Sequence, residues 1–186
     1  MMQEMDFEIP SLNEIYNYLI EIANTIKKRN VGIDLVVGIA RGGIVPARFL
    51  SDLLLIPDIK IISAKYYAEP GKKFNKPVVE ERLGRDEVFN KRILLVDDVA
   101  DTGETLIEVR NKLIRMGASR VYIAVIYIKP WNKASVDFFA KQTTKWIVFP
   151  WEFMETAKQL KRSKSWAKFL KRVREKGLEY LLNNLD

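Results

Sequence analysis

The chain has 186 residues, 48% hydrophobic and 30% charged, enough to bury the core of one soluble domain with a small appendage. It contains neither cysteine nor histidine, which excludes disulfides, thiolate nucleophiles, Ser-His-Asp catalysis and zinc sites built on those residues. Acid–base chemistry is left to Asp, Glu, Lys or Tyr, and any metal should be bound by oxygen, as Mg2+ is. The net charge of +7 suits an anionic small substrate and does not by itself indicate nucleic acid.

The sequence also bears on location. No apolar run approaches the roughly 20 residues that span a membrane, and the opening MMQEMDFEIP lacks the basic and then apolar pattern of a secretory signal. The absence of cysteine fits a reducing compartment. We therefore expect a cytoplasmic protein with no membrane partner.

The first half of the chain alternates helical and strand patterns. Ser11 suits a helix N-cap with Glu14 at the capping-box position, and the apolar spacing after it predicts a helix ending near residues 28–30. Strands are predicted at residues 35–39 and 59–64, separated by a helix over 45–54 with Pro46 in its first turn. Residues 67–90 lack an apolar period, and we expect a long mobile segment, a lid candidate, with an edge hairpin around 77–83.

The second half continues the alternation. Residues 93–96 predict a third strand, and residues 105–116 a helix that Gly117 ends. A fourth strand is predicted at 121–128 and a fifth at 146–149, before Pro150. We therefore predict an α/β fold, a twisted parallel sheet flanked by helices, formed by residues 1–153. Residues 154–186 would form a basic helical extension whose apolar side packs on this domain or on a sister subunit, with membrane or RNA contact as the alternative.

The most informative segment is residues 92–105, RILLVDDVADTGET. Two acids, Asp97 and Asp98, follow the third strand, and Asp101 comes three residues later. Ligands of open α/β sheets bind beyond the carboxyl ends of strands, and free N–H groups at a helix N-terminus favour phosphate. Adjacent acids suit hydroxyl groups or Mg2+. The segment therefore predicts a ligand with both a phosphate and a polyol, of which a ribose 5-phosphate is the simplest.

This segment resembles the phosphoribosyl-diphosphate (PRPP) motif of type I phosphoribosyltransferases: a short apolar strand, two acids, two apolar residues and then Asp-Thr-Gly-x-Thr. Residues 36–46, VVGIARGGIVP, similarly resemble the diphosphate loop of the bacterial xanthine-guanine enzymes. The resemblance implies that Arg41 and Gly42 hold diphosphate and that Asp97 and Asp98 bind ribose hydroxyls, with Asp98 nearer a Mg2+ cofactor. It also implies that the 5-phosphate is held by Thr102, Gly103, Glu104 and Thr105.

A base site is suggested further along the chain. Lys129 ends the fourth predicted strand, and Trp146 and Ile147 precede a Pro-Trp-Glu cluster at residues 150–152. A lysine can donate to a carbonyl and an indole can stack on a base, although composition alone favours a solvated lysine and core tryptophans. The arrangement resembles that of 6-oxopurine phosphoribosyltransferases. By that resemblance Lys129 contacts the purine O6, Trp146 stacks on the ring, and the Ile147 backbone faces its exocyclic edge.

The resemblance implies a purine-salvage enzyme that transfers 5-phosphoribosyl from PRPP to N9 of guanine, hypoxanthine or xanthine. Asp101 would lie beside the purine N7 as proton acceptor and also contact the phosphoribosyl group. The family implies a dimer, and we expect no nucleic-acid partner. Two alternatives stay open: a PRPP- or nucleotide-sensing regulator that binds RNA or DNA through the basic extension, and a transferase for adenine or a pyrimidine.

Overall fold

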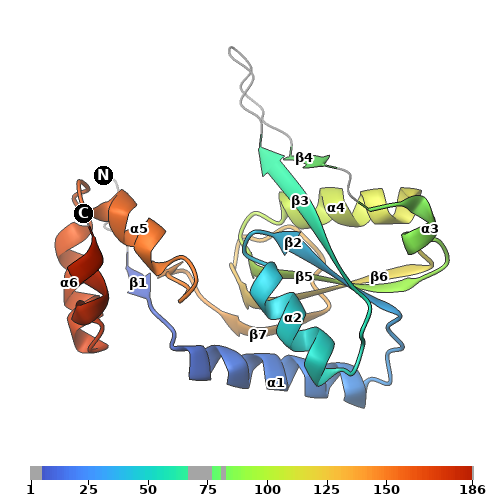
Figure 1. Ribbon diagram of the computed structural model, residues 1–186, viewed down its shortest axis with the longest axis horizontal. Coiled ribbons are helices and arrows are strands. Elements are labelled where there is room, and N and C mark those ends of the chain that lie inside the picture. The colour runs from blue at the N-terminus through green and yellow to red at the C-terminus, as the bar shows by residue number, and fades with distance from the viewer. Residues whose placement is uncertain (1–5, 67–76, 81–82, 186) are drawn as a thin grey trace, which may run out of the picture. The chain divides into compact units, whose positions relative to one another are not determined.

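The computed structural model describes residues 6–66, 77–80 and 83–185 (Figure 1). The chain divides into two compact units, one of residues 16–143 and one of residues 1–15 together with 144–186. We call them the sheet unit and the terminal unit, and each is described by itself. Half of the expected lid, residues 67–76 and 81–82, lies outside the described residues, so the lid stays a prediction.

Strands in the described part of the sheet unit form a six-stranded sheet in the order β4-β3-β2-β5-β6-β7. Neighbouring strands are parallel except for β3 and β4, which are antiparallel. The predicted α/β fold with a parallel sheet is thus confirmed. The strands are β2 (Leu35–Ala40), β3 (Ile59–Tyr66), β4 (Pro77–Glu80), β5 (Arg92–Ala100), β6 (Arg120–Ile128) and β7 (Phe138–Gln142).

The helices begin and end close to their predicted limits. At the start of α1, the Ser11 N–H donates to Glu14 Oε2 (2.8 Å) and the Glu14 N–H donates to Ser11 Oγ (3.2 Å), the expected capping box. Gly117 has φ of 96° one residue after the C-cap of α4, as a helix-ending glycine should. The short α3 was not predicted. The helices of this part of the chain are α1 (Leu12–Lys28), α2 (Ile44–Leu53), α3 (Arg85–Val88) and α4 (Glu104–Arg115).

Helices cover both faces of the sheet, with α2 and α4 on opposite sides (Figure 1). The α4 side chains Leu106, Val109 and Leu113 pack in one core cluster with alternate residues of β2, β5 and β6. On the other face, Gly38 of β2 lies so close to α2 that an added Cβ would be 2.8 Å from Ala47 Cβ. Because strand side chains alternate between faces, both sides of these short apolar strands are buried.

The terminal unit has its own core. Its β1 (Phe7–Glu8) pairs in parallel with β8 (Trp146–Ile147), and it continues through α5 (Phe153–Leu160), α6 (Trp166–Glu175) and η1 (Glu179–Asn184). The Phe169 ring is fully buried, with its centroid 5.5 Å from that of Phe7 and 5.7 Å from that of Phe153. The apolar side of the C-terminal helices therefore packs within this unit. Among the described helices, not one is both long enough and apolar enough to cross a bilayer.

Two strand predictions were wrong. Residues 146–149 were expected as the next strand of the sheet, but β8 pairs with β1 instead, and β7 occupies the sheet edge beside β6. The third strand was expected to end at Val96. Instead, β5 continues to Ala100, because β6 goes on pairing with it after its pairing with β2 has ended. Asp97 and Asp98 thus belong to the end of the strand, where β5 is paired with β6 alone, rather than to the loop after it.

Candidate active site

The candidate site lies at the topological switch point of the sheet, where the chain stops adding strands on one side and begins to add them on the other. The chain proceeds from β2 to β3 on one side and from β5 to β6 on the other, while β2 and β5 are direct neighbours. The segments that follow β2 and β5 therefore diverge and leave a crevice at the carboxyl ends of these strands. Ligands of open α/β sheets bind at such a switch point.

The loop after β2 lies directly against β5. A Cβ added to Gly42 would be 2.2 Å from Asp98 Oδ2, and one added to Gly43 would be 2.4 Å from the Val96 carbonyl oxygen. Only glycine allows this approach. The Ala40–Arg41 peptide bond is cis, and the Arg41 side chain is exposed. The structure thus brings the predicted diphosphate loop and the predicted acid pair together.

The acid pair is withdrawn from water. Asp98 is 7% exposed and Asp97 is half-buried, and the Asp98 N–H donates to Asp97 Oδ1 (3.0 Å). Burial, together with the neighbouring Asp98 carboxylate, raises the pKa of Asp97 well above its usual value. Ionising both carboxyl groups here costs free energy, and hydroxyl donors or a cation bound to them would lower that cost.

The acid pair offers two neighbouring carboxylates as possible ligands of Mg2+. The described residues include no cluster of three or more Asp, Glu, His or Cys side chains that could hold a metal. Mg2+ in phosphate sites commonly takes one or two carboxylates and completes its octahedron with water and substrate oxygens. The Asp97–Asp98 pair fits that mode of binding.

A hollow opens at the N-terminus of α4. Its volume is about 320 Å3. Gly103 is the N-cap residue of α4 and has φ of 82°, and it makes no side-chain hydrogen bond that caps the helix. The Glu104 N–H donates to Thr102 Oγ1 (3.4 Å), and the Glu104 side chain is exposed. Backbone N–H groups and the positive end of the helix dipole favour an anion here. The hollow is lined by Asp97, Val99, Ala100, Asp101, Thr102, Gly103, Thr105 and Leu106.

The turn after β6 closes onto this loop, a contact that the sequence analysis missed. The Lys133 N–H donates to the Thr102 carbonyl (3.0 Å), and a Cβ on Gly103 would be 2.3 Å from Asn132 Oδ1. Asn132 also forms a local turn with Ala134: its Nδ2 donates to the Ala134 carbonyl (2.7 Å). The sequence does contain a signal for this turn, an Asn two residues before a small residue, because Asn side chains favour turns of this kind.

This turn also brings Lys129 close to Asp101. Lys129 is 8% exposed, and its ammonium lies 5.6 Å from the ring centroid of Trp131. Trp131 Nε1 in turn donates to Asp101 Oδ1 (2.7 Å). Trp131 was not among the predicted site residues. The other two predicted base-site residues, Trp146 and Ile147, lie on β8 in the terminal unit, where Trp146 is exposed and Ile147 is buried.

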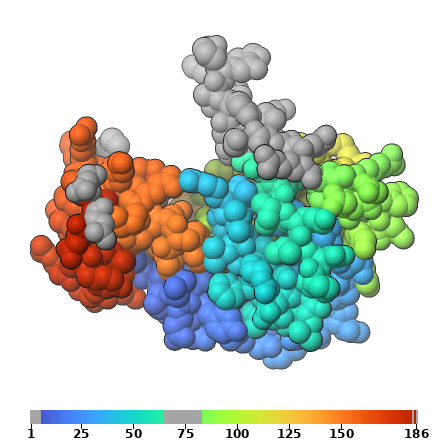
Figure 2. Space-filling view, in the orientation of Figure 1, coloured from blue at the N-terminus to red at the C-terminus, as the bar shows by residue number. Residues whose placement is uncertain are grey.

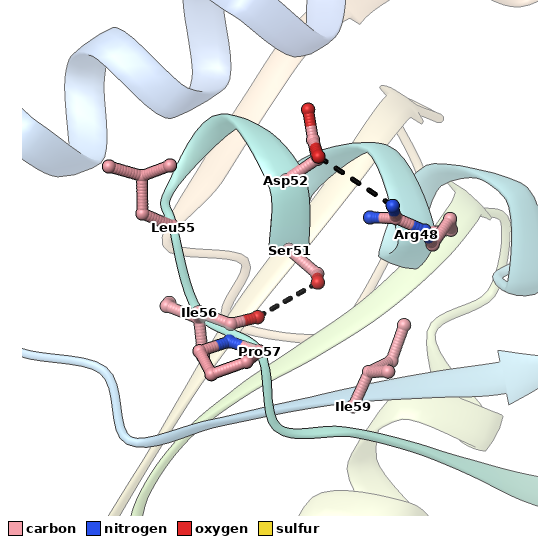
Figure 3. Close-up of a pocket in the computed structure, with 7 residues that line it drawn as sticks. All are labelled: Arg48, Ser51, Asp52, Leu55, Ile56, Pro57 and Ile59. Atoms are coloured by element: carbon pink, nitrogen blue, oxygen red, sulfur yellow. Dashed lines mark hydrogen bonds and ion pairs between the residues drawn. The ribbon is translucent and has the colours of Figure 1, made fainter.

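A second hollow lies at the C-terminal end of α2, on the face shown in Figure 2 and enlarged in Figure 3. Its volume is about 520 Å3. Its polar groups are paired among themselves: Arg48 lies 3.6 Å from Asp52, and Ser51 Oγ donates to the Ile56 carbonyl (2.8 Å). Leu55, Pro57 and Ile59 complete the lining. This hollow is a poorer site for an anionic sugar than the one at α4.

Comparison with known proteins identifies the family of the chain. Residues 10–157 match the phosphoribosyl transferase domain family, and the chain belongs to that family. The chain is 37% identical over 123 residues to a xanthine-guanine phosphoribosyltransferase of Cereibacter sphaeroides, covering 63% of this chain and 68% of that protein. The corresponding protein of Nitratidesulfovibrio vulgaris is 32% identical over 119 residues, with the same coverage. A crystal structure of a purine phosphoribosyltransferase from Pyrococcus horikoshii has a TM-score of 0.69 at 34% identity, covering 79% and 94% of the two chains.

Proposed function

We propose that this phosphoribosyltransferase is a purine-salvage enzyme that transfers 5-phosphoribosyl from PRPP to N9 of a 6-oxopurine and releases diphosphate. The observation that carries the proposal is the convergence of three segments on one crevice: the Arg41–Gly43 loop, the Asp97–Asp98 pair and the N-terminus of α4. These segments match the three parts of PRPP. The similarity to the named xanthine-guanine enzymes supports an oxopurine as acceptor.

In this proposal the phosphate groups are held at the two glycine-rich loops. The 5-phosphate enters the hollow at α4 and accepts from the N–H and hydroxyl groups of residues 102–105, while the exposed Glu104 carboxylate stays outside it. Arg41 and the Gly42 backbone hold diphosphate, for which the planar guanidinium is well suited. Close packing of Gly42 on Asp98 sets the spacing between diphosphate and ribose.

Asp97 and Asp98 bind the ribose hydroxyls, and Asp98 is the residue that would hold Mg2+, together with oxygens of PRPP and water. A Mg2+ held by Asp98 would supply positive charge that offsets the charge of the diphosphate leaving group. The two carboxylates stabilise the positive charge that develops on the ribose as the C1–oxygen bond breaks. Their withdrawal from water strengthens that interaction because the local dielectric is low.

Asp101 lies beside the purine N7 and accepts its proton as N9 bonds to C1 of the ribose, while diphosphate leaves with the electron pair of the broken bond. Lys129 donates to the O6 carbonyl, a group that adenine lacks. The roles in base binding that the sequence resemblance implies for Trp146 and Ile147 stay predictions. The chain functions in the cytoplasm as a homodimer, which size-exclusion chromatography with light scattering can test.

The decisive experiment is diphosphate release from PRPP and Mg2+ with guanine, hypoxanthine, xanthine, adenine, orotate and uracil in turn. We expect turnover with oxopurines only. Turnover with adenine or a pyrimidine would keep the PRPP site and refute the role of Lys129. PRPP or nucleotide binding without turnover on any base would favour the alternative of a regulator acting through the basic terminal unit.

A matched pair of variants tests the base site. Lys129→Met removes a charged donor to the base, which is worth about 1.5–3 kcal/mol, or roughly 10- to 100-fold. We expect the KM for the oxopurine to rise by about that factor while the KM for PRPP is unchanged. Lys133→Met is the control, because the Lys133 side chain is exposed in the same turn and contributes only its backbone N–H. Equal effects of the two variants would exclude Lys129 from base binding.

A further inference from the structure

One side chain of the sheet unit links two residues of the proposed base site. Trp131 Nε1 donates to Asp101 Oδ1 at 2.7 Å, and the Trp131 ring faces the Lys129 ammonium at 5.6 Å from its centroid. An indole N–H can only donate a hydrogen bond, so Oδ1 of Asp101 is the acceptor of this bond. Asp101 itself is exposed in the loop between β5 and α4. A short exposed carboxylate of this kind would otherwise rotate freely.

Packing alone does not account for the contact. Trp131 is 50% exposed, so only half of its surface is withdrawn from water. The turn that contains it is closed by other groups: the Asn132 N–H donates to the Lys129 carbonyl (3.0 Å), and the side chain of Asn132 bonds with Ala134. The backbone of the turn therefore does not depend on the indole. A large aromatic side chain held at the surface of a site, with its one polar atom bonded to a proposed catalytic carboxylate, indicates a role in the site.

We propose that Trp131 is a positioning residue: its indole N–H holds Oδ1 of Asp101 so that Oδ2 faces the purine N7, and its ring holds Lys129 at the same side of the base. This inference rests on the proposed function. The hydrogen bond sets the rotation of the carboxylate before the base binds, which reduces the freedom to be lost in reaching the transition state. The contact with Lys129 couples the proton acceptor to the group that recognises O6.

Trp131→Phe tests the proposal, because phenylalanine keeps an aromatic face toward Lys129 and removes only the N–H and the second ring. We expect kcat with the preferred oxopurine to fall about 10-fold, with the KM for PRPP unchanged. In Trp131→Ala, which also removes the ring, the KM for the base should rise as well. Trp166→Phe is the control for losing an indole, since Trp166 packs in the terminal unit.

A second readout does not depend on turnover. The indole N–H resonance of Trp131 is identified in the proton–nitrogen NMR spectrum by its loss in Trp131→Phe. It should shift upfield in Asp101→Asn, because a neutral amide is a weaker acceptor than a carboxylate. An unchanged resonance would overturn the contact.

The kinetic outcomes separate this inference from the proposed function. If the parent chain turns over a base and Trp131→Phe has the same kcat, the positioning role is refuted and the proposed function stands. A faster Trp131→Phe variant would also refute it, since the bond would then have to break before catalysis. No turnover by the parent chain with any base would overturn both proposals.

Discussion

The glycine that opens α4 offers the sharpest test of the phosphate loop. Gly103 has φ of 82°, and a Cβ there would be 2.3 Å from Asn132 Oδ1 and 2.6 Å from the Ala134 backbone nitrogen. A left-handed backbone costs an alanine about 1–2 kcal/mol, and forcing a methyl group into a filled space costs about 1–3 kcal/mol more. Gly103→Ala should therefore lower the free energy of unfolding by about 2–5 kcal/mol.

Gly117→Ala supplies the matched control. Gly117 also has positive φ, 96°, in the same unit, but a Cβ there meets the ring of Phe89 at 2.7 Å. Phe89 is 59% exposed and can turn away, so this variant should cost only the backbone term of about 1–2 kcal/mol. The two variants thus differ in what surrounds the added methyl group.

Urea titration gives the free energies of unfolding, and isothermal titration calorimetry gives the Kd for PRPP. Because Gly103→Ala must also move the N–H groups that face the 5-phosphate, we expect PRPP to bind roughly 10- to 100-fold more weakly, while Gly117→Ala binds normally. Equal loss of stability in the two variants would refute the packing argument. Parental PRPP affinity in Gly103→Ala would refute the phosphate site.

Three further predictions follow from the site and the second core. Asp101→Asn should lower turnover about 100- to 10,000-fold and leave the affinity for PRPP unchanged. Steady-state kinetics measure the turnover and calorimetry measures the affinity. A fully active variant would exclude Asp101 as the proton acceptor. The folded pKa of Asp97 is raised, so the folded state binds more protons than the unfolded chain, and stability falls as pH rises from about 4 toward that raised pKa. Asp97→Asn should therefore increase the unfolding free energy at neutral pH and flatten its pH dependence in urea titrations; lower stability at pH 7 would contradict the assigned cause. Phe169→Ala should destabilise the terminal unit by about 3–5 kcal/mol, measured by its urea midpoint, and a loss below about 1 kcal/mol would mean that the buried ring is not central to that core.

Much of the secondary structure was predictable because its signals are local. The capping box of Ser11 and Glu14, the stop at Gly117 and the doubly buried apolar strands are each set by a few neighbouring residues. The same holds for the residue 97–105 motif, whose chemistry follows from side chains adjacent in sequence.

The strand predictions were wrong where the structure of a segment depends on the strand with which it pairs. Residues 146–149 are more apolar than β7, and apolarity reports burial but not which strand or helix provides it. The edge strand β7 alternates between buried Phe138 and exposed Phe139, a weak signal in five residues. The Trp131–Asp101 contact joins two loops that are 30 positions apart, and nothing in either loop alone indicates it.

The terminal unit has a consequence for how the protein is made. Phe7 and Ile9 are buried in a cluster with Val148 and side chains of α5 and α6, and β1 pairs with β8; all of these partners lie more than 130 residues later in the sequence. At a synthesis rate of about 5–20 residues per second, those partners emerge from the ribosome on the order of ten seconds later. The sheet unit can fold in that interval, while β1 has an unpaired edge and the side chains of Phe7 and Ile9 lack the partners that bury them. During translation, the edge of β1 is thus open to pairing with other chains until β8 has been made.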